Sequence, residues 1–129
     1  MNNNEIRLTD AEWSVMDCLW QKSPRTGREL VAELQETMGW SRSTVLTLLG
    51  RLEHKGAVVA DCSGKIKQYR PCLGHEDAAR QEAESLIDRA YRGSLSLLVS
   101  TLTKKQSLPQ SEIDELYAIL DGLEADDHA

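Results

Sequence analysis

The chain has 129 residues and carries 15 basic and 21 acidic residues, a formal net charge of −6. This length allows one domain of ordinary size, or a small domain with an appendage. Because no apolar run reaches the roughly 18 residues of a membrane-spanning helix, and no basic-then-apolar leader opens the chain, we expect a cytoplasmic protein without a membrane partner. The three cysteines, Cys18, Cys62 and Cys72, lack CxxC spacing, which argues against a disulfide scaffold and favours reduced thiols.

The charge is distributed unevenly along the chain. Residues 1–74 hold 10 basic and 9 acidic residues, whereas residues 75–129 hold 5 and 12. Within residues 39–70, six cations accompany only two carboxylates. A local cationic excess inside an acidic chain favours a nucleic-acid-binding surface in the first half of the sequence.

Each of the first two predicted helices begins at a capping box, in which a threonine and the glutamate three residues later satisfy each other's backbone N–H groups. Thr9 and Glu12 predict a helix that ends near Gln21. Thr26 and Glu29 predict a second helix, which a glycine ends. A short turn separates the two.

The third predicted helix begins after Ser41, runs to Lys55 and ends at Gly56. About three residues connect it to the second helix, which is the short turn of a helix-turn-helix. Its apolar residues fall at i, i+3, i+4 and i+7 and define one buried face; they are Val45, Leu48, Leu49 and Leu52. Cationic and hydroxyl residues occupy the opposite face, with no carboxylate before Glu53.

A β-hairpin is predicted after the third helix. The runs AVVAD and KIKQYRP, rich in β-branched residues and tyrosine, flank a CSG turn. Three helices followed by a hairpin form a winged helix. The wing carries Lys65, Lys67 and Arg70, where cations can lie along a phosphate backbone.

From His75 onward the pattern is helical, and Gly93-Ser94 is expected to kink or split the first of these helices. Such a long apolar stripe without globular bulk cannot bury itself, so a second copy of the chain is its simplest cover. The predicted homodimer interface comprises Leu86, Ile87, Ala90, Leu95, Leu98, Leu102, Leu116 and Leu120. The predicted fold is mainly α with a small β-hairpin: an N-terminal winged helix-turn-helix over 1–74 and a C-terminal helical dimerisation region over 75–129.

The polar face of the third helix has two interpretations. It can be merely solvated, as in a winged helix that serves only as a protein-interaction module without sequence-specific DNA binding. The conjunction of a short turn, a carboxylate-poor helix and a basic hairpin favours contact with double-stranded DNA, since the first turns of a recognition helix enter the major groove. Within those turns, Leu46 can touch a thymine methyl group or pack against the turn.

The sequence gives no sign of a catalytic or metal site. His54, His75 and His128 are far apart and no pair has ligand spacing. Cys62 and Cys72 are expected at distant points of the hairpin, because a strand rises about 3.3 Å per residue. No glycine-rich phosphate loop, nucleophile elbow or paired His and Glu motif occurs. We therefore expect no catalytic residue, no cofactor and no bound metal.

The chain resembles the penicillinase-repressor family over nearly its whole length. The motifs LTDAEWSVMDCLW, WSRSTVLTLLGRLEHKG, GKIKQYRP and YRGSLSLLV occur in the family's order and spacing. The resemblance implies a dimeric transcriptional repressor that binds palindromic TACA/TGTA-type operators through the major groove and regulates a β-lactam or copper response. Carried over by position, the helix residues that contact DNA are Ser41, Ser43, Thr44, Leu46, Thr47 and Arg51, beside which we place Arg42 and the three wing cations.

The chain departs from the family pattern at several places. Ser43 and Leu46 replace longer, often basic residues of the penicillinase-repressor branch, which leaves the operator sequence open. WSRSTVLTLL is closer to the copper branch, but that branch's CxCxxxxCxC metal switch is missing from a chain that ends LEADDHA. In the antibiotic-resistance branch a sensor protease cleaves the dimerisation helices; the corresponding bond here joins Thr101 and Leu102, without the usual Asn-Phe pair.

Overall fold

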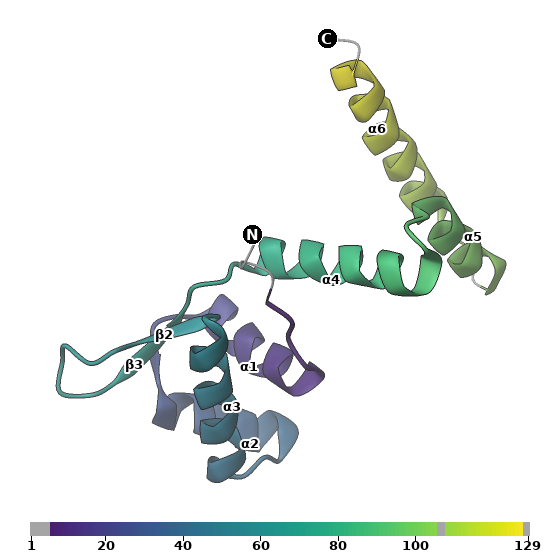
Figure 1. The fold of residues 1–129 in the computed structure, drawn as a ribbon. Helices are drawn as coiled ribbons and strands as arrows, with labels where there is room; N and C mark the ends of the chain where they lie inside the picture. Colours follow the sequence, from purple (N-terminus) through teal and green to yellow (C-terminus); the bar gives the residue numbers. More distant parts are fainter. Residues whose placement is uncertain (1–5, 106–107, 128–129) are drawn as a thin grey trace. The chain divides into compact units, whose positions relative to one another are not determined.

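The computed structural model describes residues 6–105 and 108–127, which form six helices and three short strands (Figure 1). In chain order these are α1 (Asp10–Gln21), β1 (Arg25–Thr26), α2 (Gly27–Met38), α3 (Arg42–Lys55), β2 (Val58–Asp61), β3 (Gln68–Pro71), α4 (His75–Tyr91), α5 (Leu95–Lys105) and α6 (Gln110–Asp127). The chain divides into two compact units at Ser85 and Leu86, inside α4. The functional division predicted at 74/75 stays a prediction.

The first three helices begin and end where the sequence predicts. In the capping box of α1, the Glu12 N–H donates to Thr9 Oγ1 at 3.1 Å and the Thr9 N–H donates to Glu12 Oε1 at 2.8 Å. Thr26 and Glu29 form the same pair of bonds at α2. Gly39 and Gly56 end α2 and α3 in the left-handed conformation, which glycine adopts without steric cost.

The core of the first unit forms around the predicted apolar face of α3. This face packs on α1 and α2, which Figure 1 shows gathered beside α3 with the β2–β3 hairpin projecting from them. The most deeply buried large apolar side chains of the three helices are Val15, Met16, Leu19, Leu30, Leu34, Val45, Leu49 and Leu52. Burial of this apolar surface, at about 25 cal/mol per Å², fixes the side of α3 that remains exposed.

The sheet differs from the prediction in two respects. A two-residue strand, β1, joins the hairpin, so β3 lies between β1 and β2 in an antiparallel sheet. Two residues are too few for a sequence pattern. The hairpin also turns through residues 62–67 rather than through the three predicted turn residues, because pairing stops at Asp61 and Gln68. There the Asp61 carboxylate accepts the Ser63 N–H at 2.9 Å, which diverts the backbone from the ladder.

The beginning of α4 packs against the helices of the first unit. Ala78 belongs to the hydrophobic core, and the Trp20 indole N–H donates to the carbonyl oxygen of Leu73 at 2.8 Å. The rings of Trp13 and Trp20 lie edge-on to each other and to His75, with centroid distances of 5.0–6.4 Å. The first turns of α4 are therefore part of the winged-helix unit.

The residues of the second unit whose burial is described form no buried core of their own. Beyond Ala78, none of the residues whose burial is described is fully buried. Arg92 and Gly93 take positive φ angles of 49° and 83° between α4 and α5, which confirms the predicted break at Gly93-Ser94. In α5, Leu97 and Val99 are exposed as well as the predicted Leu95 and Leu102. An α-helix that is apolar on more than one side is typically buried in an assembly.

A buried ion pair joins the start of α1 to the end of α3. Glu12 is fully buried, and its Oε1 accepts a bond from Lys55 Nζ at 2.5 Å, while Lys55 also donates to the Arg7 carbonyl oxygen at 2.7 Å. Burial raises the pKa of Glu12, but the bonds from Lys55 and Thr9 outweigh it and hold the pKa below its ordinary value of 4.5. The ionised pair therefore stabilises the folded chain.

We predict that Glu12→Gln lowers the free energy of unfolding by about 2–3 kcal/mol at pH 7, because it leaves a partly buried lysine without its partner. The folded pKa of Glu12 is depressed, so the wild-type advantage is present above about pH 4.5 and shrinks as the pH falls through the lower folded value. Urea unfolding followed by circular dichroism at pH 7 and at pH 3–4 measures both effects.

Glu29→Gln is the matched control, because Glu29 holds the same capping position in α2 but is exposed. Its loss is expected to stay within about 0.5 kcal/mol. Equal losses for the two variants, or a Glu12→Gln loss that is the same at both pH values, would contradict the role given to the ion pair.

Candidate nucleic-acid interface

All the helix residues predicted to contact DNA lie exposed on one side of α3 and at its cap. They are Ser41, Arg42, Ser43, Thr44, Leu46, Thr47 and Arg51. The apolar face buried against α1 and α2 leaves this side free, as the helical periodicity predicts. Their contact with DNA stays a prediction, but the structure brings them together.

Hydroxyl groups cluster at the start of α3. Ser41 Oγ caps the helix by accepting the Thr44 N–H at 3.2 Å, and it lies 3.1 Å from Ser43 Oγ and 3.0 Å from Thr44 Oγ1. These three side chains are exposed. Hydroxyls of this kind can bond to phosphate oxygens or base edges, and the helix N-terminus itself favours an anion.

Leu46 is partly exposed and also lies near a neighbouring helix. Its side chain is 37% exposed on the cationic side of α3. Its Cδ2 also lies 3.6 Å from the point where a Cβ on Gly27 would be, so it sits beside the start of α2. Leu46 therefore lies close to the start of α2, and both of its predicted roles, packing against the turn and contact with a thymine methyl group, stay predictions.

The wing presents its cations from two different local structures. Lys65 and Lys67 lie in the 62–67 loop, and Arg70 lies on β3; all three are exposed. Ile66, between the two lysines, is 66% exposed and was not singled out by the sequence pattern. Within the described residues, Lys65 forms no hydrogen bond or ion pair, so its ammonium is available to an external anion.

Lys67 has partners inside the protein. Its Nζ lies 3.8 Å from Glu53 Oε1 of α3 and 5.2 Å from the centroid of the Tyr69 ring. The pKa of Lys67 is raised above its ordinary value, mainly by Tyr69 and to a lesser extent by the Glu53 carboxylate, so the side chain stays charged. Sequence reasoning missed this pairing because it depends on how β3 lies against α3, which no local pattern encodes.

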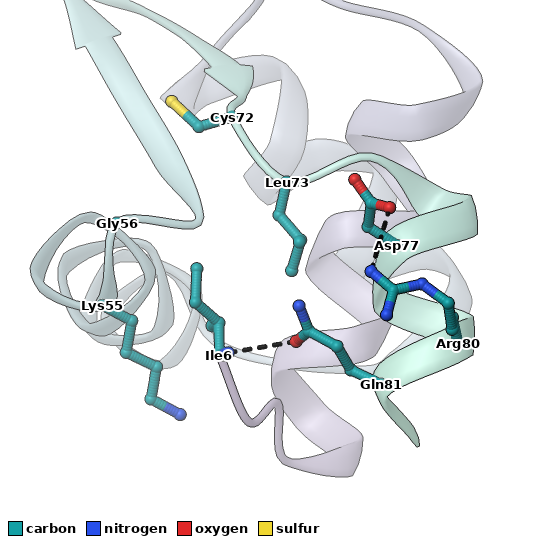
Figure 2. A pocket seen from close by; sticks show the side chains of 8 residues that line it. All are labelled: Ile6, Lys55, Gly56, Cys72, Leu73, Asp77, Arg80 and Gln81. Carbon is teal, nitrogen blue, oxygen red and sulfur yellow. Dashed lines mark hydrogen bonds and ion pairs between the residues drawn. The ribbon is translucent and has the colours of Figure 1, made fainter. Parts of the chain in front are cut away.

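A cavity of about 480 Å³ opens beside the end of α3 and the first turns of α4 (Figure 2). Its charged side chains have partners within the first unit. Lys55 bonds to Glu12, and Arg80 pairs with Asp77 at 3.4 Å and with Glu84 at the same distance. The Ile6 N–H donates to the amide oxygen of Gln81 at 3.0 Å, as the dashed line in Figure 2 shows. The Ile6–Gln81 bond joins α4 to the segment before α1, whereas the two Arg80 pairs lie within α4 itself.

The cysteines do not form a metal centre in the part of the chain that the structure describes, where no cluster of potential ligands occurs. Cys18 is buried, and its thiol donates to Glu33 Oε2 at 3.3 Å. The pKa of Cys18 is raised to about 11, mainly by burial and next by the Glu33 carboxylate, so Cys18 remains a neutral thiol. Cys62 and Cys72 are exposed. Within the same residues, no helix has the length and apolar character needed to cross a bilayer.

Comparison with known proteins gives consistent matches. The Penicillinase repressor family matches residues 8–122. The Methicillin resistance regulatory protein MecI of Mammaliicoccus sciuri is 32% identical over 120 residues, which cover 93% of this chain and 98% of that protein. The Penicillinase repressor of Bacillus licheniformis is 34% identical over 115 residues, which cover 89% of this chain and 90% of that protein.

A solved structure matches the first unit. It is the solution structure of the Bacillus licheniformis BlaI monomeric form in complex with the blaP half-operator, with a TM-score of 0.52 and 34% identity. The match covers 57% of this chain and 90% of that one. It shows that the fold of the first unit is one that a solved repressor–operator complex contains.

Proposed function

Because the chain belongs to the penicillinase repressor family, we propose that it represses an operon by binding a palindromic TACA/TGTA-type operator as a homodimer. The family consists of DNA-binding transcriptional repressors, which are not enzymes, and this chain is such a repressor. The palindrome, the dimer and the residues in contact are the parts proposed here. A repressor acts where the DNA is, which is consistent with a cytoplasmic location.

The proposed DNA surface consists of the exposed side of α3 and the wing. On α3, Arg42 and Arg51 flank the hydroxyl-bearing residues, and Lys65 and Arg70 extend the positive charge onto the wing. The single observation that carries the proposal is that the hydroxyl and cationic side chains of α3 are exposed on the side that its buried face leaves free. Major-groove readout by α3, with phosphate contacts from the wing, fits this arrangement.

The second unit supports the proposed homodimer. It exposes many large apolar side chains and has no fully buried residue among those described. Of the predicted interface, Leu86, Leu95, Leu102, Leu116 and Leu120 are 37–57% exposed, Ala90 is exposed, and Ile87 and Leu98 are half-buried. A second copy of the same chain is the proposed cover, because a twofold interface pairs like with like and matches a palindromic operator.

The regulated operon is proposed to belong to a β-lactam or copper response, with a sensor protease as a further partner. The proposed cleavage bond, between Thr101 and Leu102, lies inside α5, where Thr101 Oγ1 donates to the Leu97 carbonyl oxygen at 2.9 Å. A protease binds its substrate as an extended chain, so cleavage there requires local unwinding of α5. Such cleavage would cut the proposed dimer interface and release the operator.

We predict that affinity for duplex DNA falls steeply with salt, by about 0.9 log unit per log unit of salt for each phosphate that a cation neutralises. Arg42→Gln should reduce the magnitude of that slope by about 0.9. Arg80→Gln is the matched control, since Arg80 lies on α4 outside the proposed DNA surface, and should leave the slope unchanged. Fluorescence anisotropy with a TACA/TGTA duplex at roughly 50 to 300 mM salt measures both slopes.

A winged helix that serves only for protein interaction would give a different result. Its binding to the duplex would be absent or independent of salt. Either outcome for the wild-type chain would contradict the proposed function, as would an Arg80→Gln slope that falls as much as that of Arg42→Gln.

We predict that Leu102→Asp makes the chain monomeric, because an unpaired charge buried in an interface costs several kcal/mol. The variant should keep its helical circular dichroism, and its affinity for a full palindrome should fall by about a hundredfold, toward that for a half-site. The loss follows from the second half-site contact, which is intramolecular only in a dimer. Light scattering and operator titration measure the two effects.

Ser100→Asp is the matched control for the dimer prediction. Ser100 lies on the same helix but on the polar stripe that it shares with Ser96 and Thr103, and it is exposed. This variant should remain a dimer with the parent's operator affinity. A monomeric Leu102→Asp chain that bound the palindrome as tightly as the parent would show that dimerisation does not supply the affinity.

A further inference from the structure

Glu53 places a negative charge on the helix whose exposed side is proposed to bind DNA. It is the only carboxylate of α3, and its side chain is 35% exposed. A carboxylate beside a phosphate backbone is repelled, since like charges that are exposed and close together raise the free energy of the complex. Any chain that uses the exposed side of α3 for DNA must therefore compensate this charge.

The structure provides the compensation from the wing. Lys67 reaches back from the 62–67 loop to lie 3.8 Å from the Glu53 carboxylate, and its ammonium also lies over the Tyr69 ring at 5.2 Å. Tyr69 is buried and is paired in the sheet with both β1 and β2, so the ring beneath the Lys67 ammonium is held in the sheet. Lys67 is thereby directed toward α3, whereas Lys65, two residues earlier, has no such partner within the described residues.

We propose that Lys67 is a positioning residue of the DNA surface, which neutralises Glu53 and ties the wing to α3 instead of contacting a phosphate itself. This inference rests on the proposed function. It assigns different roles to two neighbouring wing lysines: Lys65 neutralises a phosphate, and Lys67 neutralises a carboxylate of the same protein. Loss of Lys67 then exposes the Glu53 charge to the DNA and frees the wing loop.

A double-mutant cycle separates the two roles. Lys67→Met removes the charge while keeping an unbranched side chain over Tyr69, and Glu53→Gln removes its partner. For a TACA/TGTA duplex we expect Lys67→Met to weaken binding by up to about fivefold in the parent chain, the size expected for an exposed ion pair. In the Glu53→Gln background the same substitution should change affinity by less than about twofold, because the charge that Lys67 offsets is gone.

Lys65→Met is the matched control, with the same charge change in the same loop. Its loss of affinity should be equal in the two backgrounds, and it should reduce the magnitude of the salt slope by about 0.9. Lys67→Met in the Glu53→Gln background should leave the slope unchanged. Lys67→Arg keeps a cation near Glu53 and should therefore bind the duplex with the parent's affinity.

A measurement on the free protein adds a second readout. Lys67→Met and Glu53→Gln should both lower the backbone NMR order parameters of residues 62–67, and Lys65→Met should not. Equal affinity losses for Lys67→Met in both backgrounds, with a slope reduced by about 0.9, would overturn the proposal and make Lys67 a phosphate contact. That result would leave the proposed function intact, whereas absence of salt-dependent binding by the parent chain would contradict the proposed function itself.

Discussion

The apolar side of α3 has to be covered by α1 and α2, and this requirement orients the rest of the winged helix. Val45, Leu49 and Leu52 are almost completely buried, so the opposite side of the same helix is held outward in a fixed orientation. Burial of the apolar side is therefore sufficient to expose the hydroxyl and cationic residues on the opposite side. The hydrophobic effect is non-directional, so the detailed placement of α3 depends on the polar contacts at its ends.

Two polar contacts lie in the C-terminal half of α3. Lys55 reaches the buried Glu12 carboxylate and fixes the helix to α1, and Lys67 reaches Glu53 and connects the wing to the same helix. The first pair is buried on its acidic side and stabilises the fold, whereas the second is exposed and contributes little to stability. The exposed pair is more informative about function, because it removes negative charge from a surface proposed to meet phosphates.

Local patterns predicted the helices well. The capping boxes at Thr9 and Thr26 involve residues three apart, so the sequence alone contains the whole interaction. The length of the wing loop and the Glu53–Lys67 contact could not be predicted in this way. The first depends on the Asp61 side chain ending the ladder, and the second depends on the distance between α3 and β3 in space. Exposed Leu97 was also missed, since it lies outside the apolar stripe of α5. Val99 and Ile119 were missed although they continue the stripes of their helices, four residues after Leu95 and three after Leu116.

We propose that the exposed side of α3 and the wing together form the surface that meets DNA. Amide hydrogen exchange of the full chain, with and without a TACA/TGTA duplex, tests it most directly. We predict increased protection in residues 41–51 and 62–70, with little change along α1, because the bound duplex covers α3 and the wing. Protection confined to α1 and α2, or unchanged exchange in α3 while the duplex is bound, would contradict it.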